Sequence, residues 1–210
     1  MTSGVGGSGF ELGRHREGVR GAVSCLAVDG RPLRILQAQD VAGLRDEALR
    51  AAEQGIEAVL VGSSPLGDPF VLLAGLSDAV RGLTLVARVV LGEDGRHPTL
   101  LAREATSLDL VDGGRTVLCF SPPFGEGLDE AMGICRAMWR QGTATNDGPV
   151  YPVADALNRP RPAGEGSPLI ALDLTGPGAR DEAGGSAALA DMVVVRDEAG
   201  DGTAWRLERV

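Results

Sequence analysis

Short apolar runs alternate with amphipathic stretches along most of this chain. The runs are too short for helices of ordinary length and are typical of strands that are covered on both faces. We expect strands at residues 23–28, 58–61, 83–91, 117–120, 169–174 and 192–195. Residues 205–210 are a candidate for one further short strand.

Helices are expected between these runs, because capping residues precede stretches of helical periodicity. Asp68-Pro69 places an N-cap before a proline at the first helical position, and His97-Pro98 opens another helix. The clearest amphipathic stripe runs from Leu128 to Trp139. The proline-containing stretch 143–167 is expected to be an extended surface loop, and a weak Gly- and Ala-rich helix should follow residue 174. The main helices are expected at residues 40–55, 68–80, 97–112 and 128–141.

Repeated strand–helix units joined by short loops predict an α/β fold with a parallel sheet and right-handed crossovers. About six strands are expected, against eight in a complete barrel, so the chain is too short to close a full eight-stranded barrel. Residues 1–18 are rich in Gly and Ser and are expected to form a flexible tail. Residues 19–210 are then a single domain with a substantial core.

Composition excludes several classes of function. The net charge of −9 opposes binding to nucleic acid, and no apolar run is long enough to span a membrane. The N-terminus lacks the apolar stretch of a secretion signal, so a cytoplasmic protein is expected. All 20 basic residues are arginines, which excludes a lysine-dependent phosphate loop or Schiff base. Cys25, Cys119 and Cys135 are expected to be buried free thiols, and no cluster of metal-ligating residues is present.

A series of short motifs follows the helices and strands in order. Each motif alone is weak, but together they span the chain from about Asp40 to Val195. The motifs are residues 52–59 (AEQGIEAV), Asp68-Pro69-Phe70, Arg96-His97-Pro98, residues 105–109 (ATSLD), Gly113-Gly114-Arg115, Tyr151, Gly176-Pro177 and Ala190-Asp191. In this order the chain resembles the luciferase-like monooxygenase family, which includes bacterial luciferase and deazaflavin-dependent oxidoreductases.

The resemblance implies a (β/α) TIM-type barrel, here shortened or incomplete, with parallel strands. It also implies that FMN or a deazaflavin (coenzyme F420) binds at the C-terminal ends of the strands. By position, the candidate cofactor-binding residues are Ser63, Ser64, Arg88, Val89, Val90 and Gly176. The peptide bond between Val89 and Val90 lies where family members often have a cis bond behind the flavin ring.

Each candidate also has a structural interpretation. Ser63 and Ser64 suit polar positions in a loop that leads into a helix, and Arg88 suits an ion pair as well as a cofactor phosphate. Gly176 suits an ordinary turn. His97 is expected to act at the entry to its helix rather than as a proton donor.

Because the chain departs from the family at three places, two classes of function stay open. Gly62, Ser63 and Ser64 stand where many members have an acidic residue and histidines, so the catalytic residues are unknown. Residues 119–123 (CFSPP) replace a glycine-rich run, and the last third of the usual barrel is missing. The chain is therefore either a flavin- or deazaflavin-dependent oxidoreductase with weakened or lost catalysis, or a non-catalytic flavin-binding protein or partner subunit.

The resemblance also implies association, because family members commonly dimerise through their second and third helices. Ala74, Gly75, Ser77 and Ala79 on the second expected helix would allow another helix to approach closely. An incomplete barrel would in addition expose strand edges that a partner must cover. We expect a homodimer, or a heterodimer with a full-length luciferase-like homologue.

Overall fold

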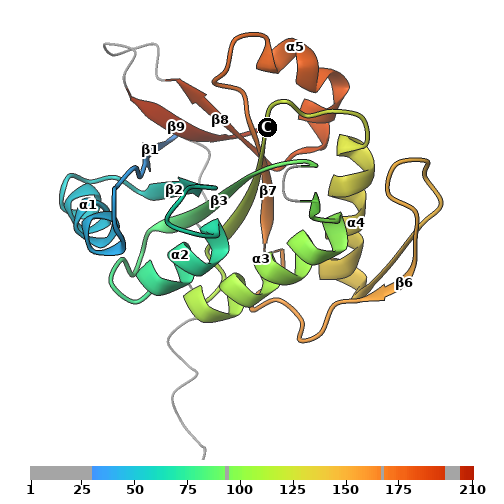
Figure 1. Ribbon diagram of the computed structural model, residues 1–210, viewed down its shortest axis with the longest axis horizontal. Helices are drawn as coiled ribbons and strands as arrows, with labels where there is room; N and C mark the ends of the chain where they lie inside the picture. The colour runs from blue at the N-terminus through green and yellow to red at the C-terminus, as the bar shows by residue number, and fades with distance from the viewer. Residues whose placement is uncertain (1–29, 93–94, 167, 197–203) are drawn as a thin grey trace, which may run out of the picture.

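Seven strands form a closed barrel in the computed structural model, which describes residues 30–92, 95–166, 168–196 and 204–210 (Figure 1). The barrel strands are β1 (Arg31–Ile35), β2 (Ala58–Gly62), β3 (Thr84–Val90), β4 (Thr116–Ser121), β7 (Leu169–Asp173), β8 (Met192–Arg196) and β9 (Trp205–Arg209). The first six pair in parallel, in the order in which they occur along the chain. The prediction of a shortened parallel (β/α) barrel is confirmed.

The last strand closes the barrel in a way that the sequence did not suggest. β9 pairs antiparallel with β8 on one side and with β1 on the other. Because β9 satisfies both edges at once, seven strands suffice where a complete barrel uses eight. The expectation that an incomplete barrel leaves its strand edges exposed is therefore wrong for the described barrel strands.

Four helices cover the outside of the barrel, and α2, α3 and α4 lie side by side (Figure 1). They begin where the sequence predicted. Asp40 accepts a hydrogen bond from the Gly43 backbone N–H at 2.7 Å, and His97 Nδ1 accepts one from the Thr99 N–H at 3.2 Å. The expected helix-entry role of His97 is thus confirmed. The helices are α1 (Val41–Glu53), α2 (Pro69–Leu76), α3 (Pro98–Asp112) and α4 (Leu128–Gln141), followed by the short α5 (Ala179–Ala183) and a 3₁₀ turn, η2 (Gly184–Leu189).

The core has two parts, because successive side chains of a strand point to opposite faces. The larger part lies between the barrel and the helices and includes Leu85, Phe120 and Met138. The smaller part fills the barrel interior with side chains such as Leu60, Val86 and Val194. The interior is thus a packed core rather than a channel.

Two segments differ from the sequence-based expectation. Residues 143–167, expected as a loop, contain a hairpin of β5 (Thr143–Asn146) and β6 (Val153–Leu157). Glu130 of α4 anchors this hairpin by accepting hydrogen bonds from the Tyr151 N–H and Asn146 Nδ2, both at 2.9 Å. The Tyr151 bond is also the main reason that the pKa of Glu130 lies below its usual range. Since the anchor comes from another element, local sequence gave little sign of the hairpin.

The first described strand, β1, was also missed. Its sequence, Arg-Pro-Leu-Arg-Ile, contains two arginines and a proline instead of forming a continuous apolar run. The strand expected at residues 23–28 and the tail expected at residues 1–18 lie outside the described residues. Of the helices that the structure describes, none is both long and apolar enough to cross a membrane.

Candidate functional site

The predicted cofactor-binding residues gather at one end of the barrel. Ser63 and Ser64 directly follow β2, and Gly176 follows β7. Arg88 and Val90 lie at the C-terminal end of β3. Because β2, β3 and β7 belong to the parallel part of the sheet, their C-terminal ends meet at the same rim. The rim therefore brings together segments that are more than 110 residues apart in the sequence (63 to 176).

An ion pair crosses this rim. Arg88 Nη1 lies 3.4 Å from Asp173 Oδ2, the last residue of β7. The Asp173 side chain is 5% exposed and the Arg88 side chain 32% exposed, so the carboxylate is buried while the guanidinium reaches solvent. Gly62 on the neighbouring strand makes room for Arg88, since a Cβ there would lie only 3.0 Å from Arg88 Nε.

Asp173 is held by two further side chains. Ser121 Oγ donates to Asp173 Oδ2 at 3.1 Å, and both the N–H and the hydroxyl of Thr175 donate to Oδ1. Both carboxylate oxygens are thus occupied by donors, which suits a fixed carboxylate better than a general base. The arrangement can hold the Arg88 guanidinium in place as a partly exposed cation at the rim.

Sequence reasoning missed Ser121, Asp173 and Thr175. One signal was present, because Ser121 and Asp173 are polar residues at the ends of otherwise apolar runs. In a parallel barrel such positions place polar groups at the C-terminal rim.

Val89 and Val90 point to opposite sides of β3. Val89 is 3% exposed and packs in the core between the barrel and the helices. Val90 lies on the other face of β3, the same face as Val86 and Arg88. The peptide bond between them is trans, unlike the bonds before Pro123 and Pro160, so the family's cis bond is absent at this position. Only Val90 is placed to present its side chain at the rim.

The remaining candidates take part in local contacts. Ser64 Oγ accepts a hydrogen bond from the Leu66 N–H at 3.2 Å, within a turn that leads to α2. Ser63 is exposed beside it. A Cβ at Gly176 would lie 3.7 Å from Pro122, an ordinary contact that places the segment after β7 against the segment after β4.

Cys119 lies in the barrel interior beside the ion pair. It is fully buried, and burial raises the pKa of its thiol well above the usual value, with a further increase from the nearby Asp173 carboxylate. Burial likewise raises the pKa of the Cys135 thiol to about 12. Both thiols are therefore structural at neutral pH rather than nucleophilic.

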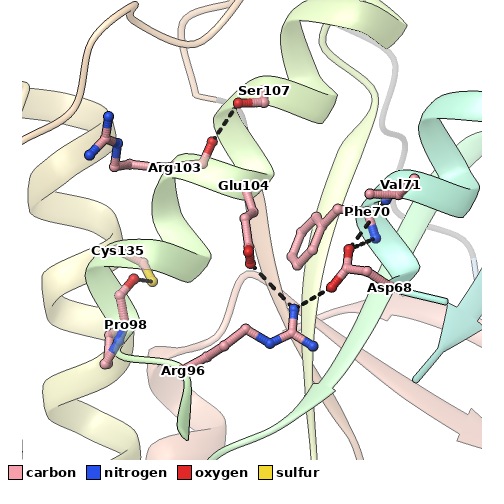
Figure 2. A network of polar contacts seen from close by, with 9 residues as sticks. All are labelled: Asp68, Phe70, Val71, Arg96, Pro98, Arg103, Glu104, Ser107 and Cys135. Atoms are coloured by element: carbon pink, nitrogen blue, oxygen red, sulfur yellow. Dashed lines mark hydrogen bonds and ion pairs between the residues drawn. The ribbon is translucent and has the colours of Figure 1, made fainter. Parts of the chain in front are cut away.

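A second network joins the two helices beside the rim. Figure 2 shows the Arg96 guanidinium between Asp68, before α2, and Glu104, within α3. Arg96 Nη1 lies 2.6 Å from Asp68 Oδ2 and 3.3 Å from Glu104 Oε2. Burial raises the pKa of Glu104, and the attraction of Arg96 partly opposes this effect. Since the other Asp68 oxygen caps α2, the network fixes the entries of α2 and α3 to each other.

The fold and the rim define a parallel α/β barrel with a polar site at the C-terminal ends of its strands. Residues 22–120 match the family model described as luciferase-like monooxygenase, which confirms the resemblance to this family over that part of the chain. No match was found among curated proteins.

Solved structures of similar fold include three enzymes. The coenzyme F420 dependent tetrahydromethanopterin reductase from Methanopyrus kandleri is 15% identical, with a TM-score of 0.66 over 80% of this chain and 56% of that one. An F420-dependent secondary alcohol dehydrogenase is 15% identical, with a TM-score of 0.61 over 77% and 56%. A monooxygenase from Streptomyces bottropensis is 21% identical, with a TM-score of 0.52 over 64% and 49%. At these identities the likeness concerns the fold, and this chain spans about half the length of each structure.

Proposed function

We propose that this protein binds a flavin-type cofactor, FMN or coenzyme F420, at the C-terminal rim of the barrel. In this proposal it is a luciferase-like oxidoreductase homologue with weakened or lost catalysis. The observation that carries the proposal is the partly exposed Arg88 guanidinium, which pairs with Asp173 at the rim in space that Gly62 leaves open. A guanidinium fixed in this way suits a cofactor phosphate or another anionic group of the cofactor.

The residues present fit a cofactor at the rim but not one inside the barrel. Leu60, Val86 and Val194 fill the interior and are completely buried, so a ring system would have to lie above Arg88. When bound, a flavin-type cofactor itself supplies the redox chemistry. The contribution of the rim residues would be to bind and orient it.

The alternative is a non-catalytic flavin-binding protein or a partner subunit of a full-length luciferase-like enzyme. Asp173 favours this alternative, because donors occupy both of its oxygens and leave it poorly suited to move a proton. The Cys119 thiol, whose pKa is raised, is also unsuited to act as a nucleophile at neutral pH.

Titration of the purified protein with FMN and with coenzyme F420, followed by absorbance and fluorescence, tests this proposal. We expect submillimolar binding of at least one cofactor, and roughly tenfold weaker binding by Arg88→Ala, since a charge-assisted contact is lost. Arg45→Ala on α1 is the matched control and should bind like the parent protein. Binding with protein-dependent oxidation of the reduced cofactor supports an enzyme, and binding without it supports a carrier. Absence of binding to both cofactors contradicts the proposal and leaves the partner subunit.

We further propose that the protein is a dimer, either with itself or with a luciferase-like homologue, through α2 and α3. Since β9 pairs both edges of the barrel sheet, this proposal places the contact on the helices rather than on the barrel strands. The large exposed apolar side chains that support this surface are Val71 on α2, which is 70% exposed, and Leu100, Leu110 and Val111 on α3, which are 46%, 42% and 61% exposed.

Sedimentation velocity at micromolar concentration tests the dimer. We expect a dimer that Val71→Glu converts to monomer, because a charge in an apolar contact is costly. Val41→Glu on α1, which is 58% exposed, is the control and should remain dimeric. A monodisperse monomer that also forms no complex with a full-length homologue would refute the proposal.

A further inference from the structure

A cavity of about 490 Å³ lies at the other end of the barrel from Arg88 and Asp173. The C-terminal half of α4 forms one wall, and the segment that leads from the hairpin to β7 forms the other. Its charged lining residues are Arg136, Arg140, Arg161, Glu165 and Asp191. A cavity of this size lies in the range that small-molecule ligands occupy.

Arg136 lines this cavity and is held there by an ion pair. Its Nη2 lies 3.1 Å from Asp191 Oδ2, and the same oxygen accepts a hydrogen bond from the Ile170 N–H at 2.9 Å. The Arg136 and Asp191 side chains are 21% and 31% exposed, so the pair is partly shielded from water. Asp191 thus neutralises Arg136 and ties it to the start of β7.

Arg161 is fixed on the opposite wall. Its Nη2 donates to the Arg140 carbonyl at 2.9 Å, at the C-terminal end of α4 where the helix dipole favours a cation. Gly142 makes room for this guanidinium, because a Cβ there would lie 2.5 Å from Arg161 Nη1. The Arg161 guanidinium is therefore positioned before any ligand arrives.

Arg140 is the third arginine that lines the cavity. It lies four residues after Arg136, on the same face of α4, and it is exposed. Within the part of the chain that the structure describes, no carboxylate pairs with its side chain. Three guanidinium groups thus face two carboxylates, Glu165 and Asp191, so the lining is net positive on a chain of net charge −9.

We propose that this cavity binds a small organic anion through a phosphate or carboxylate group. Arg140 and Arg161 would hold the anionic group, because guanidinium groups match the geometry of both oxyanions. Pro162 and Pro168 offer apolar contacts to the rest of the ligand. The site is separate from the proposed cofactor site, since the two lie at opposite ends of the strands.

Isothermal titration calorimetry in a buffer of low ionic strength without phosphate tests the site. The probes are inorganic phosphate, AMP and citrate, with adenosine as the uncharged control. We expect submillimolar binding of at least one anion and none of adenosine. Binding of AMP but not citrate assigns a phosphate ligand, and the reverse result assigns a carboxylate. If no anion binds below about 10 mM, the proposal is wrong.

Variants locate the binding site on the protein. Arg140→Ala and Arg161→Ala should each weaken binding roughly tenfold, because each removes a charge-assisted contact. Glu165→Gln should strengthen binding, since it removes a negative charge from the lining. Arg45→Ala should leave the affinity unchanged. Arg140 and Arg161 are both exposed, so circular dichroism should show that their variants fold.

Two results would overturn this assignment. One is unchanged affinity in the Arg140→Ala/Arg161→Ala double variant. The other is loss of anion binding in Arg88→Ala, which would place the anion at the C-terminal rim instead. Unchanged binding of FMN or coenzyme F420 by the double variant would further separate this site from the proposed cofactor site.

Discussion

Asp173→Ala is expected to lower the free energy of unfolding by about 2–3 kcal/mol and the melting temperature by roughly 4–12 °C. The substitution removes the carboxylate that pairs with Arg88 and accepts from Ser121 and Thr175. Loss of one partner of a buried pair costs about 3–5 kcal/mol. The expected loss is smaller here because the Arg88 side chain is 32% exposed and can turn toward water.

Thermal and urea unfolding followed by circular dichroism measures this effect. Asp78→Ala is the matched control, because the Asp78 side chain is 86% exposed and its pairing with Arg81 is a surface contact. We expect the control to change stability by less than about 1 kcal/mol. The loss of unfolding free energy in the Arg88→Ala/Asp173→Ala double variant should be smaller than the sum of the losses in the two single variants, since the double variant leaves neither partner unpaired. Additive losses would show that Arg88 and Asp173 do not interact.

Leu207→Ala is expected to lower the free energy of unfolding by about 3 kcal/mol, which corresponds to a decrease of roughly 6–12 °C in melting temperature. Leu207 is 1% exposed and belongs to the core inside the barrel. It lies on β9, opposite Arg31 of β1 and Val194 of β8. The cavity left by the truncation therefore falls at the point where the barrel closes.

The same unfolding measurements check this prediction against Val210→Ala. Val210 is three residues further along the chain and 62% exposed, so its truncation should cost less than about 0.5 kcal/mol. Leu207→Met, which nearly conserves volume, should cost less than about 1.5 kcal/mol. Equal, small losses in Leu207→Ala and Val210→Ala would mean that β9 does not contribute to a closed barrel.

Much of the fold could be predicted from the sequence because its signals are local. The N-caps Asp40 and Asp68 fixed the starts of α1 and α2, since a side chain can satisfy free backbone N–H groups only at a helix end. Continuous apolar runs indicated β2, β4 and β7, because strands covered on both faces need apolar residues at every position. Of these segments, α1, α2 and β2 lie within residues 22–120, which match the luciferase-like family model.

The candidate site could be predicted only in part. The resemblance to the luciferase-like family made Arg88 and Gly176 candidates, and they share one rim because parallel strands end on the same side. The partner of Arg88 could not be read from the sequence, because Asp173 lies 85 residues further along the chain. Val89 follows Arg88 along β3, but the pleat turns its side chain toward the helices.

The sequence by itself therefore determined most of the strand–helix units and their order, and its family resemblance indicated the end of the barrel at which polar groups collect. Only the tertiary structure decided that β9 closes seven strands into a barrel, that Glu130 anchors a hairpin, and that Arg140 and Arg161 line a cavity with Arg136. The physical reason is the range of the interactions. Caps and apolar periodicity act within a few residues, whereas strand closure and ion pairs depend on groups that the chain brings together only after it has folded.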